Sequence, residues 1–181
     1  MTTTTAGRVW RSAIALGIAA LAIGGCAMFS HDRHDELDGP ELSDEQTRAQ
    51  VVEPAKRIVQ GADLHDFTGS FRFESCNDQN EAPYRGVAEL TFKFPPDIGQ
   101  QAYLDHVAAA MLDLGWEEGA PPGKMPYGRV LHQGKMMAIM APWPDHPTTG
   151  GIKVYGECRN LTDQRKQGGL SRQDIAGELT G

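Results

Sequence analysis

The stretch at residues 21–26 (LAIGGC) constrains this chain more than any other, because it decides which residues remain to fold. Arg8 and Arg11 are the charged residues before it, and an apolar run of about a dozen residues follows them. Signal peptidases need small side chains beside the bond that they cut, and here two glycines precede a cysteine. We therefore predict a bacterial lipoprotein signal peptide over residues 1–25, with diacylglycerol and palmitate chains on Cys26.

Two other interpretations of this stretch remain open. The apolar run could stay in place as a transmembrane helix, but a span needs about 20 residues. The signal could also be cleaved without lipidation, but Cys26 lies at the position where the lipoprotein pattern requires a cysteine. Because more than one acyl chain gives stable anchoring, we expect a membrane anchor at the cell membrane, with the domain on its extracytoplasmic face.

The mature chain would have the size and charge of one exported domain. Cleavage leaves about 155 residues, which suits a single core. The signal holds two of the 17 basic residues and none of the 24 acidic ones, so the mature chain has a formal net charge of −9. This balance argues against nucleic acid as a partner and against electrostatic adhesion to anionic lipid. The same excess of acidic residues favours solubility, which is the simpler explanation for it.

The three cysteines fit the same compartment. If Cys26 carries lipid, Cys76 and Cys158 form an even pair in an oxidising environment. A disulfide between them would close a loop of about 80 residues and stabilise the fold by about 4 to 5 kcal/mol in the chain-entropy model. Metal or redox use is the alternative, but the chain has no Cys-x-x-Cys spacing. We predict a structural disulfide.

Residues 26–42 are predicted to be a flexible acidic tether, because they are highly charged, lack periodicity and contain a Gly-Pro break. The nearby side chains of His31, Asp32, His34 and Asp35 could bind a divalent metal weakly. A disordered segment loses chain entropy when it forms such a site. We therefore favour a solvated tether and predict no metal site and no cofactor.

Two helices are predicted. Ser43 and Gln46 have the spacing of a capping box, and an apolar stripe at helical spacing follows them. Pro54 should kink this helix or make it begin afresh, and Gly61 is a plausible end. A second helix should follow Asp97 as its cap and end at Gly115 in a left-handed conformation.

Strands account for the other ordered segments. Apolar residues alternate over 67–76 and 88–94, which predicts an antiparallel hairpin. Further strands are expected at 129–133, 136–141 and 152–156. The methionines of 136–141 are interpreted as core residues, with copper ligands as the alternative. Trp116 should pack the second helix onto the sheet, and ligand stacking is the alternative for it.

These segments predict an α+β fold: a two-layer sandwich in which two helices cover one face of an antiparallel sheet of five or six strands. The globular domain should span 43–163. Residues 164–181 carry little apolar surface and are expected to be a mobile C-terminal tail.

Several short motifs lie at residues 51–56 (VVEPAK), 75–79 (SCNDQ), 83–84 (PY), 156–160 (GECRN) and 162–163 (TD). Together they resemble the LppJ family of mycobacterial lipoproteins. The resemblance spans roughly 42–163 with similar spacing between the motifs. It implies a membrane-anchored location and a shared fold, and it identifies no catalytic residue.

No hydrolase motif and no glycine-rich phosphate loop is present in the sequence. One constellation remains as a candidate ligand site. A bond between Cys76 and Cys158 would bring four polar residues together beside it: Asn77, Asp78, Arg159 and Asn160. The alternative is a self-satisfied turn in which Asp78 pairs with Arg159.

The sequence is therefore compatible with two classes of function that make structural demands. The favoured class is a non-catalytic module of the cell envelope that binds a protein, glycan or lipid through the sheet face or near Trp116 and Trp143. The other class is an enzyme that acts on envelope material, which would require a concave pocket with convergent titratable residues. A purely structural role is a third class without a signature of its own.

Overall fold

The computed structural model describes residues 39–143 and 145–181. The predicted signal peptide, Cys26 and residues 27–38 of the predicted tether, with their histidines, lie outside the described residues. Within the described part of the chain, no helix has the length and apolar character needed to cross a bilayer.

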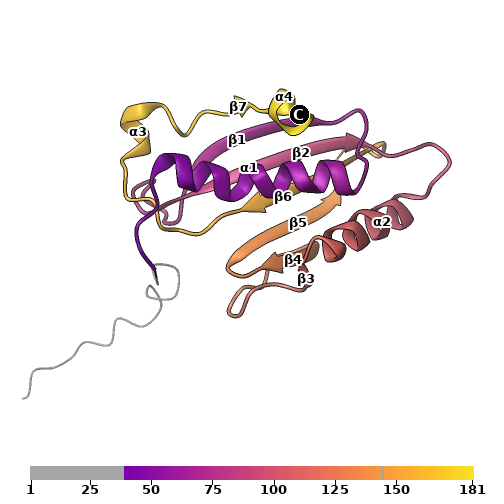
Figure 1. Ribbon diagram of the computed structural model, residues 1–181, viewed down its shortest axis with the longest axis horizontal. Helices are drawn as coiled ribbons and strands as arrows, with labels where there is room; N and C mark the ends of the chain where they lie inside the picture. Colours follow the sequence, from indigo (N-terminus) through magenta and orange to yellow (C-terminus); the bar gives the residue numbers. More distant parts are fainter. Residues whose placement is uncertain (1–38, 144) are drawn as a thin grey trace, which may run out of the picture. The chain divides into compact units, whose positions relative to one another are not determined.

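One antiparallel sheet of seven strands organises the domain (Figure 1). Its spatial order is β3-β4-β5-β6-β2-β1-β7. The strands are β1 (Thr68–Ser75), β2 (Tyr84–Lys93), β3 (Glu117–Glu118), β4 (Arg129–Gln133), β5 (Met136–Pro142), β6 (Thr149–Tyr155) and β7 (Gln173–Asp174). The predicted α+β class is confirmed. The strand count exceeds the expected five or six because two edge strands, β3 and β7, have two residues each.

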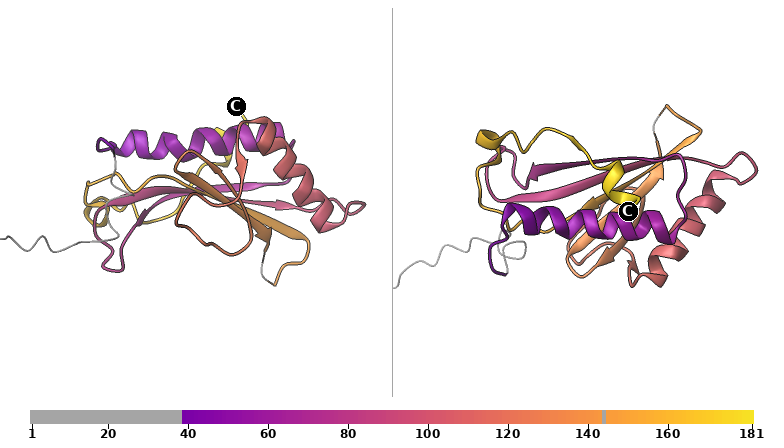
Figure 2. Two further views of the ribbon diagram at one scale, coloured as in Figure 1. Left: turned by 90° about the horizontal axis from the view of Figure 1, so that it is seen from below. Right: turned by 45° about the horizontal axis from the view of Figure 1, so that its top comes forward.

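Two long helices, α1 (Asp44–Gly61) and α2 (Gln100–Asp113), pack on the same face of the sheet, as the left view of Figure 2 shows. We call the opposite face the open face. The predicted capping box is present, since Ser43 Oγ accepts from Gln46 N and Gln46 Oε1 accepts from Ser43 N. Gly115 has the expected positive φ of 86°.

The structure excludes one of the two alternatives for the first helix and corrects the predicted start of the second. α1 does not restart at Pro54 but runs through it, with the proline ring buried among the packed residues of the helix. Burial of the apolar stripe on the sheet compensates for the hydrogen bond that a proline removes. α2 begins after Gly99 rather than after Asp97, and its cap makes no side-chain hydrogen bond.

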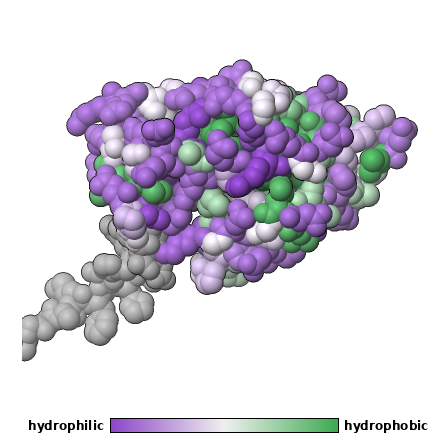
Figure 3. All heavy atoms as spheres, viewed as in Figure 1, coloured by the Kyte–Doolittle hydropathy of each residue, from purple (hydrophilic) through white to green (hydrophobic). Residues whose placement is uncertain are grey.

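The core lies between the helices and the sheet. The predicted hairpin of β1 and β2 is confirmed, with Phe71 opposite Ala88 and Thr68 opposite Thr91. Both Phe71 and Leu90 are almost fully buried, and Met140 and Ile152 extend the core into β5 and β6. The space-filling view from the helix side is mostly hydrophilic, with small scattered hydrophobic patches (Figure 3). The apolar residues of the sheet are thus covered on that side.

The C-terminal segment is not a mobile tail, which corrects the prediction for 164–181. It forms α3 (Gln164–Gln167), β7 and α4 (Ala176–Leu179). β7 pairs with β1, and Ile175 and Leu179 are buried. Gly69 leaves room for this packing, since a Cβ there would lie 2.6 Å from Leu179 Cδ1. The globular domain therefore continues to the end of the described chain.

Candidate binding site

The predicted disulfide between Cys76 and Cys158 is confirmed, with the two Cα atoms 6.1 Å apart. It joins the end of β1 to the segment that follows β6. Because β2 separates these strands in the sheet, the bond fixes the sheet at this end. Cys158 is buried and Cys76 is half-buried.

The four candidate ligand residues beside the bond do not converge on one point. Asn77 organises its own loop, since its Nδ2 donates to the carbonyl oxygens of Glu81 and Ala82. Asn160 is buried and its Nδ2 donates to Asp44 Oδ1 at 2.7 Å. These two amides therefore complete the local structure.

The two charged members of the predicted cluster also point to different surroundings. Arg159 pairs with Glu157 at 3.1 Å, not with Asp78, and its Nε donates to Pro40 O at 2.8 Å. Asp78 is exposed at a small hollow that Asn77 and Arg85 also line. The structure thus brings Asn77 and Asp78 together and directs Arg159 toward the beginning of the described chain.

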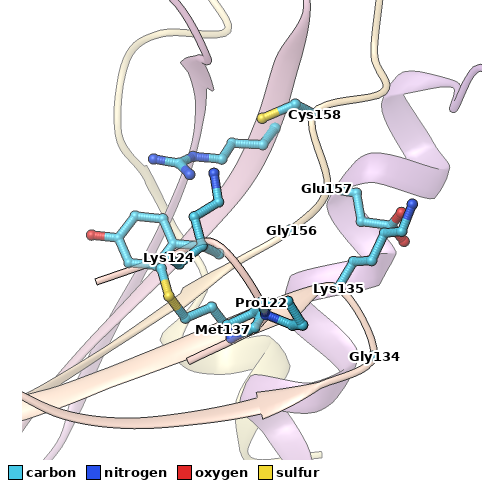
Figure 4. Close-up of a pocket in the computed structure, with 11 residues that line it drawn as sticks. Pro122, Lys124, Gly134, Lys135, Met137, Gly156, Glu157 and Cys158 are labelled. Atoms are coloured by element: carbon cyan, nitrogen blue, oxygen red, sulfur yellow. The ribbon is translucent and has the colours of Figure 1, made fainter. Parts of the chain in front are cut away.

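A cavity of about 290 Å³ lies at the disulfide end of the open face. Its walls come from β2, β5, β6 and the loop 119–128 between β3 and β4. The lining residues are Arg85, Pro121, Pro122, Lys124, Gly134, Lys135, Met137, Tyr155, Gly156, Glu157 and Cys158. Figure 4 shows Lys124 and Met137 on one side of it, Glu157 and Lys135 on the other, and Cys158 at one end.

A stacked pair of residues from neighbouring strands lines the cavity. The guanidinium carbon of Arg85 lies 4.6 Å from the centroid of the Tyr155 ring. Glu74 holds this guanidinium in place, since its Oε1 accepts from Arg85 Nη2 at 2.5 Å. Burial of its ring raises the pKa of Tyr155, and the Arg85 charge opposes that rise. The phenol is therefore neutral near pH 7 and presents an apolar ring beside a cation.

Helix α1 supports the wall opposite this pair. Gln50 Nε2 donates to Glu157 Oε1 at 2.7 Å, while Gln50 Oε1 accepts from Glu157 N at 2.8 Å. Gly156 permits this approach, because a Cβ there would lie 2.6 Å from Gln50 Oε1. Glu157, the acidic residue of the lining, is thus held by Gln50 and Arg159.

A second polar cluster occupies the middle of the open face. Glu89 is 3% exposed, and its Oε2 accepts from Arg172 Nη2 at 3.1 Å. Arg72 and Lys153 each place a nitrogen 3.7 Å from the same oxygen. The other oxygen, Glu89 Oε1, is buried and has no hydrogen-bond partner among the described residues. Long side chains, rather than a second layer of helices, cover this carboxylate.

The two tryptophans singled out by the sequence have different environments. Trp116 is 4% exposed, so it packs in the core as predicted and offers no stacking surface. Trp143 is half-buried over Gly151, with Lys153 Nζ 6.0 Å from its ring centroid. Of the two tryptophans, Trp143 therefore belongs to the open face.

In the described ranges, no group of three or more histidine, cysteine or acidic side chains is arranged to hold a metal ion.

Sequence reasoning missed the cavity because its residues come from four separate segments. One pattern in the sequence did indicate the face on which the cavity lies. Arg85 and Glu89 lie in alternation with the small and apolar residues 86, 88 and 90 of β2, as Lys153 and Tyr155 do with 152 and 154 in β6. That alternation places charged and aromatic side chains on the face that the helices leave uncovered.

The fold and the site define a disulfide-braced α+β sandwich with a cavity, lined by basic and apolar side chains, on its open face. A family model described as "Putative lipoprotein LppJ" matches residues 43–178. The chain belongs to this LppJ family, as the sequence motifs indicated. The match extends beyond 163, in agreement with the folded C-terminal segment.

Curated relatives carry the same name. The protein of Mycobacterium bovis is 42% identical over 164 residues, which cover 86% of this chain and 86% of the relative. Those of two strains of Mycobacterium tuberculosis are 41% identical with the same coverage. No solved structure matches this chain.

Proposed function

We propose that the chain is held at the extracytoplasmic face of the cell membrane by lipid on Cys26 and acts there as a non-catalytic binding module. Its membership in a family named for lipoproteins supports the anchor. The disulfide between Cys76 and Cys158 supports an oxidising compartment. Cys26 itself follows two glycines and an apolar run, as a lipidated cysteine does.

The cavity beside the disulfide is the proposed binding site, and a small amphipathic anion is the proposed class of ligand. The observation that carries this proposal is the Arg85 guanidinium 4.6 Å from the Tyr155 ring centroid in a cavity of about 290 Å³. Apolar surface from Met137, Pro121 and Pro122 suits the hydrophobic part of such a ligand. A guanidinium is suited to a carboxylate, sulfonate or phosphate.

The binding role is favoured over an enzyme that acts on envelope material. Glu157, the acid that lines the cavity, is already bonded to Gln50 and Arg159. A general acid or base must be able to reach the proton that it transfers. The engaged carboxylate therefore fits a structural role better than a catalytic one.

The ligand class is tested by titrating the full-length protein with anilinonaphthalene sulfonate, an aromatic anion whose fluorescence reports binding. Arg85→Gln and Lys124→Glu should each weaken binding about tenfold, which corresponds to about 1.4 kcal/mol. The control is Arg48→Gln, because Arg48 lies on α1 and pairs with Glu178 outside the cavity. If the wild type and both cavity variants bind the dye with equal affinity, the cavity is not its binding site.

The anchor is tested separately by the Cys26→Ala variant. Wild-type protein should fractionate with membranes and have the added mass of its acyl chains, and the variant should lose both. If the two proteins fractionate alike and differ by no acyl mass, the anchor is refuted while the cavity proposal stands.

A further inference from the structure

The loop 119–128 carries the most exposed large apolar side chains of the described chain. Met125 is 99% exposed and Tyr127 is 100% exposed, whereas Ile98, Leu112 and Leu161 keep about half of their surface covered. The loop begins with a hydrogen bond from Gly119 N to Val130 O at 2.8 Å. Its tip therefore projects a methionine and a tyrosine into the surroundings without packing them on the domain.

This loop lies at the end of the domain where the tether joins. Lys124 lines the cavity together with Glu157 and Cys158. The next residue, Arg159, donates through its Nε to Pro40 O and accepts at its carbonyl oxygen from Leu42 N at 2.9 Å. In Figure 1 the β3–β4 loop and the first described residues lie toward the same end of the sheet.

Covalent length limits how far this end can lie from Cys26. Thirteen peptide units separate Cys26 from Gly39, and they span at most about 45 Å when fully extended. Any shorter path brings the end with Pro40, the cavity and the loop toward the anchored lipid. The opposite end, with Ile98 after β2, is the farther one, because β2 runs from Tyr84 beside Asn160 to Lys93 beside Thr149.

We infer that the loop 119–128 rests on the lipid surface to which the chain is anchored, with Met125 and Tyr127 in the interfacial region and the cavity opening beside it. This inference depends on the proposed lipid anchor. Tyrosine is suited to the interface because its ring is apolar and its hydroxyl is polar. A lysine such as Lys124 can keep its ammonium among headgroups while its stem lies along apolar surface.

Charged residues of both signs lie near the loop. The cavity lining contains three basic residues, Arg85, Lys124 and Lys135, and one acidic residue, Glu157. Coulomb interactions beyond about 8 Å are largely screened at physiological ionic strength. Two acidic residues, Glu118 and Asp78, line hollows next to Lys124 as well. The contact with lipid is therefore inferred from the exposed side chains of Met125 and Tyr127 and from the tether, and not from a net positive charge of the loop.

The orientation is tested by spin labelling at Met125→Cys in the full-length lipidated protein, reconstituted in phosphatidylglycerol-containing vesicles. With Cys26 acylated and the disulfide intact, the new cysteine is the reactive thiol. Tyr127→Cys provides a second site in the same loop. Ile98→Cys is the matched control, because it is an exposed apolar residue at the opposite end of the domain.

The labels at 125 and 127 should lose accessibility to a water-soluble paramagnetic quencher and become accessible to oxygen, whereas the label at 98 keeps its aqueous accessibility. If each variant carries one label per molecule and all three labels stay accessible from water, the inference is overturned and the anchor is left intact. Two labels per molecule, in protein that does not stay with vesicles, would refute the anchor itself. Protection at 125 that requires added envelope protein, and is absent with lipid alone, would also overturn the inference in favour of a protein partner.

Discussion

Arg172 Nη2 donates to Glu89 Oε2 at 3.1 Å, which links the C-terminal segment to the centre of the open face across 83 positions of sequence. The partners differ in environment, since the side chain of Glu89 is 2% exposed and that of Arg172 is 59% exposed. Arg72 and Lys153 complete the surroundings of the carboxylate. The C-terminal segment thus contributes charge to one face and apolar side chains to the sheet edge.

Glu89→Gln should destabilise the domain by about 1 to 3 kcal/mol, because it removes the charge that Arg72, Lys153 and Arg172 surround. Arg172→Ala should cost less than about 1 kcal/mol, because water already screens this exposed guanidinium in the wild type and Arg72 and Lys153 remain beside the carboxylate. Chemical denaturation measures both. The control is Glu178→Gln, whose carboxylate pairs with Arg48 at the surface. Equal effects of Glu89→Gln and the control would contradict a buried charge cluster.

Removal of the disulfide with Cys76→Ser/Cys158→Ser should lower the free energy of unfolding by about 2 to 5 kcal/mol. The reason is that the bond closes a long loop in the unfolded chain, because the two cysteines have a sequence separation of 82. Guanidinium unfolding without reductant provides the measurement. The Cys26→Ala variant is the control because it keeps the bonded pair. An unchanged unfolding midpoint in the double variant would show that the bond adds no stability.

Much of the fold could be predicted because its determinants are local. The capping box at Ser43, the alternation through Phe71 and Phe73, and the glycine at 115 each specify one conformation within a few residues. The pairing of Cys76 with Cys158 could be predicted because they are the two cysteines that remain once Cys26 is assigned to lipid. These features fixed the class and the order of most elements.

The remaining features depend on tertiary packing that no local pattern shows. A proline inside a helix costs about 3 kcal/mol, yet burial of neighbours such as Val51 and Ile58 on the sheet exceeds that cost. The C-terminal segment has few apolar residues, but Gly69 leaves space for one of them, Leu179. The cavity likewise requires Arg85 and Tyr155 to be adjacent, which only the strand order reveals.

Leu179→Ala should lower the free energy of unfolding by about 2 to 5 kcal/mol, although Leu179 is the third residue from the end of the sequence. Its side chain is fully buried against the sheet edge, so truncation leaves a cavity. Thermal or chemical denaturation tests this expectation. Lys166→Ala is the control in the same segment, because that side chain is 83% exposed. Indistinguishable stability of the two variants would restore the interpretation of the segment as a mobile tail.

Asp163→Asn should destabilise the domain at neutral pH and lose this effect in acid. Arg165 donates to Asp163 Oδ1 through its backbone N and, at 2.9 Å, through its Nε. These bonds, with Lys166 Nζ at 3.3 Å, hold the pKa of Asp163 well below its usual range. The carboxylate caps α3, whose Gln164 is buried against Asp44.

The sign of this pH dependence follows from the lowered pKa of Asp163 in the folded state. The stabilisation is fully present above the unfolded-state pKa of about 3.9 and is lost as the pH falls through the folded-state pKa. The stability difference between wild type and Asp163→Asn should therefore shrink steadily below about pH 4. Denaturant unfolding across a pH series measures it, with Asp97→Asn, at an exposed carboxylate, as the control. A difference that stays constant with pH would show that the asparagine acts through altered loop packing rather than through loss of the charge.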